Sequence, residues 1–214
     1  MCIVGFDPFN DRASRTVRNT LSEMLQDCLG RREVFSGVPA DWRQRYPQPP
    51  YAAYIRDRVN RYRAATSEAL SADDSPMIRA AILWRHGLYF EAHEVLEPHW
   101  QAASGEEREG LKGLIQAAGV YVHQEAGQDE ASVRLARKAV DRLRHYGDAI
   151  GDRQALGIEQ LLGELEHVMA SSRDAVNASR LTDSAKTHFI ATNGLVGKAA
   201  WRKRINSANA LWQV

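Results

Sequence analysis

The segment EAHEVLEPHW, residues 91 to 100, places two histidines and three glutamates within ten residues. On a helix successive side chains turn by about 100°, so His93 and Glu97 share one face. Glu94 lies beside that face. Glu91 points to the opposite side and is predicted to be the surface residue among the three glutamates. Imidazole and carboxylate groups bind divalent metals and transfer protons, so chemistry is expected on the His93 face.

A second polar row is expected on the helix that follows. Gln116 and His123 are seven residues apart and therefore nearly eclipsed on a helix. Gly113 and Gly119 flank this row, and such small residues would let two helix backbones approach closely. In an antiparallel helical hairpin, the second row would face His93 and its neighbours.

Two interpretations of these residues stay open. In the first, His93, Glu97 and His123 coordinate a divalent metal ion (Zn, Mn, Fe or Ni), Glu94 completes the shell or acts as a catalytic general base, and Gln116 orients the ligands. In the second, the same groups form a metal-free hydrogen-bond network that fixes the helix register.

Familiar catalytic motifs are absent. HEVLE begins like the zinc-protease motif HExxH, but position 97 is glutamate and the next histidine is His99. The chain contains no phosphate-binding glycine loop and no GxSxG motif. Cys2 and Cys28 form no CxxC motif and no disulfide framework.

Composition narrows the class of protein. With 214 residues, 44% hydrophobic and 26% charged, the chain can bury a sizeable core. A formal charge of +1 gives no strong indication of a nucleic-acid partner. The sequence shows no signal peptide and no apolar run long enough to span a membrane, so a cytoplasmic protein is predicted.

Apolar periodicity predicts helices throughout the chain. The predicted fold is all-α, a compact helical bundle of about five or six helices with a flexible C-terminal tail. Pro98 is expected to kink or end the motif helix. The arginines of the second segment are expected on a solvated basic face: Arg56, Arg58, Arg61 and Arg63. The predicted helical segments are 10–30 (ending at Gly30), 51–70, 76–86, 88–101, 105–126, 129–146 and 157–170.

Three parts of the chain are predicted. Residues 1–70 form an N-terminal helical extension that packs on the core, residues 71–171 form the helical core, and residues 172–214 form a basic, mobile tail. The tail prediction follows from the loss of apolar periodicity near residue 172.

The core residues resemble a known family. LYFEAHEVLEPHW followed by GLKGLIQAAGVYVH is similar to DUF309, a family of unknown function marked by HxxxExxW with a following Gln and His. The resemblance covers roughly residues 75 to 165 and implies an all-α bundle with a metal-binding role. The matching residues here are His93, Glu97, Trp100, Gln116 and His123.

The prediction is therefore a soluble helical-bundle protein with a His/Glu polar site that binds a divalent metal and serves hydrolysis, with Trp100 and Gln116 supporting the ligands. The alternative is a metal-free binding or scaffold module whose cluster is structural. A homodimer through the N-terminal helix is the partner prediction, and no substrate is assigned.

Overall fold

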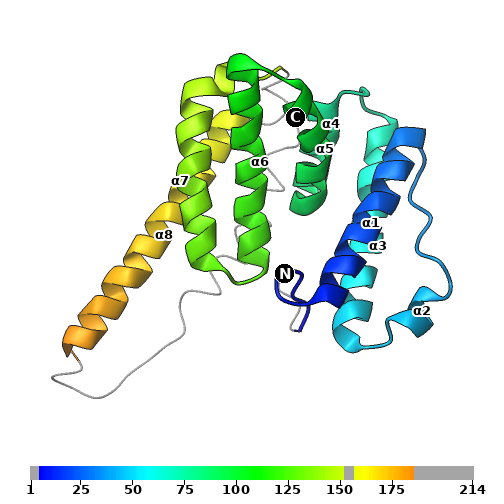
Figure 1. Ribbon diagram of the computed structural model, residues 1–214, viewed down its shortest axis with the longest axis horizontal. Coiled ribbons are helices and arrows are strands. Elements are labelled where there is room, and N and C mark those ends of the chain that lie inside the picture. Colours follow the sequence, from blue (N-terminus) through cyan, green and yellow to red (C-terminus); the bar gives the residue numbers. More distant parts are fainter. Residues whose placement is uncertain (1–4, 152–156, 186–214) are drawn as a thin grey trace. The chain divides into compact units, whose positions relative to one another are not determined.

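The chain is helical throughout the part that the computed structural model describes, which is residues 5–151 and 157–185, with side chains as far as residue 171. Figure 1 shows the arrangement. No strand occurs among these residues, so the all-α prediction is confirmed. The predicted count of five or six is too low. The helices are α1 (Arg12–Arg31), α2 (Trp42–Arg45), α3 (Pro49–Leu70), α4 (Pro76–Arg85), α5 (Tyr89–Ala102), α6 (Gly105–Glu125), α7 (Asp129–Tyr146), the 3-10 helix η1 (Gly147–Ala149) and α8 (Ile158–Ala185).

Two compact units divide the chain, residues 1–170 and residues 171–214. Helix α8 continues past residue 172 to Ala185. The predicted loss of helical structure at residue 172 therefore does not occur. Residues 172 to 185 contain no glycine or proline, so nothing in the backbone stops the helix. The rest of the predicted basic tail, 186–214, lies outside the described residues. The three-part division of the chain stays a prediction.

The first unit is built from helices that pack side by side. Helix α6 lies along α7 and also contacts α5, while α1 lies along α3 (Figure 1). Contacts of α4 with α5, and of α1 with α5, place the N-terminal helices against the motif helix. Helix α5 therefore has neighbours from both halves of this unit. None of the described helices is long and apolar enough to cross a membrane.

Local signals explain most helix ends. Ser75 caps α4 by accepting a hydrogen bond from the backbone N–H of Met77 at 3.3 Å, and Pro76 follows at the first helical position. Gly87 takes a φ of 66° just after the helix. The predicted helix 76–86 is thus confirmed to within one residue. Ser104 stands at the N-cap position of α6, but its side chain makes no capping hydrogen bond.

The end of α1 differs from the prediction. The helix passes Gly30 and ends at Arg31, and the next residue, Arg32, adopts the left-handed conformation with φ 54° and ψ 51°. Such a conformation is unfavourable for a residue with a side chain. It is held because the Arg32 guanidinium donates to the carbonyl oxygens of Leu70 at 3.0 Å and Ala72 at 3.3 Å, contacts that only the packed structure supplies.

Candidate metal centre

Helix α5 carries the polar group that the sequence singles out. Ala92 and Leu96 are fully buried and fix the side of α5 that faces the core. His93, Glu94 and Glu97 lie beside this apolar side and are half-buried. The helix continues past Pro98 to Ala102, so it does not end at Pro98, which was one of the two expectations. Proline here removes only the backbone donor that would pair with the carbonyl of residue 94, close to the end of the helix.

The three side chains form one group. One ligand atom from each of His93, Glu94 and Glu97 lies within 4.8 Å of the others. His93 Nδ1 is 3.1 Å from Glu94 Oε1. Their side chains are 30% and 37% exposed, so water reaches the group and the side chains can still turn. An imidazole with two carboxylates is a donor set that suits Zn, Mn, Fe or Ni. The residues therefore fit a divalent ion.

The predicted third ligand, His123, is not part of this group. Its Nδ1 lies 2.7 Å from Gln128 Oε1, at the turn after α6. Phe9 stacks on the same ring with 4.8 Å between ring centroids. The structure thus brings together His93 and Glu97 with Glu94, the predicted general base, and gives His123 other neighbours.

The two residues predicted to support the ligands also have other contacts. Gln116 Oε1 accepts a hydrogen bond from Arg142 Nη1 at 3.1 Å, which links α6 to α7. The guanidinium of Arg108 lies 4.5 Å from the centre of the Trp100 ring. The same guanidinium donates to the Trp100 carbonyl oxygen at 2.9 Å. Trp100 therefore takes part in closing the α5–α6 turn.

Glu91 overturns its prediction as the surface glutamate. It is fully buried, and its Oε1 accepts a 2.5 Å hydrogen bond from the Tyr62 hydroxyl. Its Oε2 lies 3.9 Å from Arg58 Nη1, too far for a hydrogen bond. The side of α5 opposite His93 is not wet, because α1 and α3 cover it: Gln26 of α1 approaches the Glu91 carbonyl oxygen, and Tyr62 belongs to α3.

Arg58 likewise departs from the predicted solvated basic face. It is only 4% exposed, and its Nη2 donates to Glu125 Oε2 at 3.0 Å. Burial opposes its charged form, but Tyr54, Glu91 and Glu125 hold the pKa of Arg58 well above the ordinary value. Burial, reinforced by the charge of Glu91, raises the pKa of Tyr62. Arg58, Glu91 and Tyr62, which are buried, form a network with the partly exposed Glu125 that joins α3, α5 and α6.

This network was missed because its partners are distant in sequence. Tyr62 and Glu91 are 29 residues apart, and Arg58 and Glu125 are 67 apart. One signal was present. Arg58 lies four residues before Tyr62, which places both on one side of a helix.

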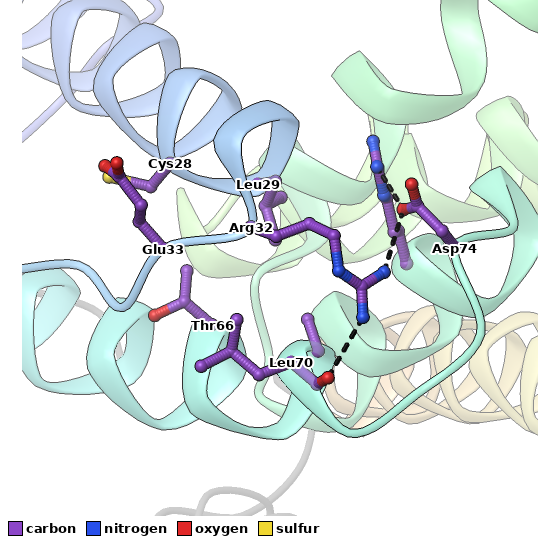
Figure 2. Close-up of a pocket in the computed structure, with 9 residues that line it drawn as sticks. Cys28, Leu29, Arg32, Glu33, Thr66, Leu70 and Asp74 are labelled. Atoms are coloured by element: carbon purple, nitrogen blue, oxygen red, sulfur yellow. Dashed lines mark hydrogen bonds and ion pairs between the residues drawn. The ribbon is translucent and has the colours of Figure 1, made fainter.

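A small hollow lies elsewhere in the first unit. Figure 2 shows it between the end of α1, the end of α3 and the start of α4, with Arg32, Thr66 and Asp74 among its lining residues. Its volume is about 10 Å³, which is room for about one water molecule. None of its lining residues belongs to the group on α5.

Fold and site together define an all-helical protein that presents one imidazole and two carboxylates from a single helix. Residues 77–135 match the family model of DUF309, a domain of unknown function. The resemblance seen in the sequence is therefore confirmed over this range, which is shorter than the predicted 75 to 165. No curated protein and no solved structure matches the chain.

Proposed function

We propose that His93, Glu94 and Glu97 bind a divalent metal ion, and that the protein uses it in hydrolysis. The observation that carries the proposal is the grouping of the three donors within 4.8 Å on a half-exposed part of α5. Among the described residues no other group of three or more such side chains has this geometry.

Physical chemistry supports a metal over a purely structural cluster. A network that fixes helix register is expected to be buried and fully hydrogen-bonded. His93 and Glu94 instead keep about a third of their side-chain surface in water. The buried register-fixing role is already filled by Glu91 and its partners.

The metal would lower the pKa of a bound water, which is the chemistry that hydrolysis needs. His93 and Glu97, four residues apart on one face, would hold the ion. Glu94, next to the His93 imidazole, would either complete the donor set or accept the proton of an attacking water. Three protein donors leave room for water or substrate, as catalytic sites require.

The alternative of a metal-free scaffold predicts a closed cluster and an exposed apolar patch. Among the described residues the large hydrophobic side chains that are exposed are Val34 at 46% and Leu70 at 40%. Two such residues make no extended surface for a partner. The homodimer and the cytoplasmic location stay predictions.

Metal titration tests the proposal. Chelator-treated protein is titrated calorimetrically with Zn²⁺, Mn²⁺, Fe²⁺ or Ni²⁺, with elemental analysis of the untreated protein in parallel. One ion per chain is expected, and His93→Ala should weaken its binding by at least about tenfold, or about 1.4 kcal/mol. At a metal concentration of about 100 Kd, the wild type should gain about 2.7 kcal/mol of stability.

His99→Ala is the matched control, because His99 lies on the same helix, is exposed and is outside the group. Its metal affinity should equal that of the wild type. Binding that is equal in all three proteins would show that the ion binds elsewhere. No binding of any of the four ions by the wild type would refute the proposal.

A further inference from the structure

Arg18 is a half-buried arginine where α1 meets α5. Its guanidinium carbon lies 3.8 Å from the centre of the Phe90 ring. Its Nε and Nη2 donate to Asn19 Oδ1 at 3.1 and 3.0 Å, and no carboxylate in the described part of the chain forms an ion pair with it. Burial lowers the pKa of Arg18, as expected for a cation that is partly desolvated. A guanidinium in this setting gains from a bound anion.

This guanidinium lies beside the metal-binding group. Phe90 stands one helical turn before His93, and their ring centroids are 6.3 Å apart. With the contact between Arg18 and Phe90, this places the guanidinium within about 10 Å of the His93 ring. The charge of Glu94 acts on Arg18 as well. One small ligand can therefore approach both groups.

The charges favour an anionic ligand. The two carboxylates of Glu94 and Glu97 would balance the charge of a divalent ion, and a neutral His93 ligand adds no charge. Arg18 then leaves the loaded site with one positive charge in excess. Arg15 on the same helix also acts on Arg18 as a second cation. The charge of Glu91 also acts on Arg18, but that carboxylate accepts the hydrogen bond from Tyr62 and lies 3.9 Å from Arg58, so it is shared with the cation of α3.

We propose that Arg18 and the group on α5 together form a binding site for a phosphoryl oxyanion, either inorganic phosphate or a phosphate monoester. This inference rests on the proposed metal-binding function. The guanidinium would donate to two oxygens of the phosphoryl group, a geometry that arginine provides and lysine does not. A further oxygen would be directed to the side of His93, Glu94 and Glu97. A carboxylate has too few oxygens to satisfy both sides in this way.

Phosphate titration of the metal-loaded protein tests the inference. Inorganic phosphate and phenyl phosphate are titrated calorimetrically into the full chain saturated with the ion that it binds. Arg18→Gln is expected to raise the Kd for phosphate at least tenfold and to leave the Kd for the metal within about threefold. Arg18→Lys should give an intermediate Kd, because it keeps the charge and loses the paired donors.

Arg12→Gln is the control, since Arg12 is an exposed cation on the same helix and its loss changes the net charge equally. Its phosphate affinity should stay within twofold of the wild type. Tighter binding of phenyl phosphate identifies a monoester as the ligand, and tighter binding of inorganic phosphate identifies the free ion.

The inference fails if Arg18→Gln binds phosphate as the wild type does, or if the metal-loaded wild type binds neither anion at millimolar concentration. These results leave the metal site standing. Absence of metal binding by the wild type would instead overturn the proposed function, and the oxyanion site with it. Unchanged metal affinity in Arg18→Gln shows that this variant is folded.

Discussion

Glu91→Ala tests the buried network most directly. The substitution removes the acceptor of the 2.5 Å hydrogen bond from Tyr62 and the carboxylate 3.9 Å from Arg58. Both partners are buried, so water cannot replace what is lost. Arg58 is then left with Glu125 as its carboxylate partner and with the carbonyl oxygen of Gly87 at 3.3 Å.

The expected loss follows from these contacts. Breaking a buried ion pair by removing one partner costs about 3–5 kcal/mol. The remaining bonds to Glu125 and Gly87 keep Arg58 partly paired, which places Glu91→Ala at the lower end, about 3 kcal/mol. For a unit of this size the melting temperature should fall by about 6–12 °C. Glu91→Gln keeps an acceptor for Tyr62 and should lose about half as much free energy.

Urea unfolding followed by far-UV circular dichroism, with chelator present to exclude any metal effect, measures this loss. Glu94→Ala is the matched control, because Glu94 has the same chemistry three residues further along α5 and is 37% exposed. It should change the free energy of unfolding by less than about 0.5 kcal/mol. A loss below about 1 kcal/mol for Glu91→Ala, or equal losses for the two variants, would refute the reasoning.

Further predictions concern helix packing and acid stability. Gly30 lies inside α1, and a methyl group added there meets no atom within 4 Å, so Gly30→Ala should raise the free energy of unfolding by about 0.5–1 kcal/mol. A methyl group added at Gly110 would lie 2.6 Å from the Tyr146 carbonyl oxygen, so Gly110→Ala should lower the free energy of unfolding by about 1–3 kcal/mol. Equal effects in urea unfolding would contradict this packing. Asp11 caps α1. Its carboxylate accepts hydrogen bonds from the Ser14 hydroxyl, which has the larger effect, and from the Ser14 backbone N–H, and these lower the pKa of Asp11 from 3.8 to about 2. Because the folded pKa is depressed, this stabilisation is present above about pH 4 and is lost as the pH falls toward 2. Asp11→Asn should therefore be less stable than the wild type at pH 6, by a margin that shrinks as the pH falls from 4 to 2. A difference that is constant with pH would contradict the assignment.

Predictions that depend on neighbours in the chain were confirmed. The start of α4 at Ser75 and Pro76, and its end before Gly87, are decided by backbone capping within a few residues. The stripe on α7 is equally local. Four apolar residues recur there at spacings of three and four, and all are buried: Val133, Ala136, Val140 and Leu143. A regular spacing of apolar residues can form only one continuous face on a helix, and that face is buried.

Predictions that depend on distant partners failed. Arg58 and Glu91 are charged residues that sequence patterns place in water, because burial of an unpaired charge is costly. Each is buried because the other and its neighbours, Glu125 and Tyr62, lie nearby. Arg32 ends α1 in place of Gly30 for a similar reason, since contacts with the end of α3 hold its backbone.

By itself the sequence determined that the chain is helical, that residues 77–135 match DUF309, and that His93, Glu94 and Glu97 come together. That group needs no tertiary contact, because three donors within five residues of a single helix are already close. Tertiary structure alone decided that Phe9 stacks on His123, that Glu91 is buried, and that Arg18 lies against Phe90. Which side of a helix meets which neighbour depends on packing between segments far apart in the chain, and helical periodicity carries no information about that choice.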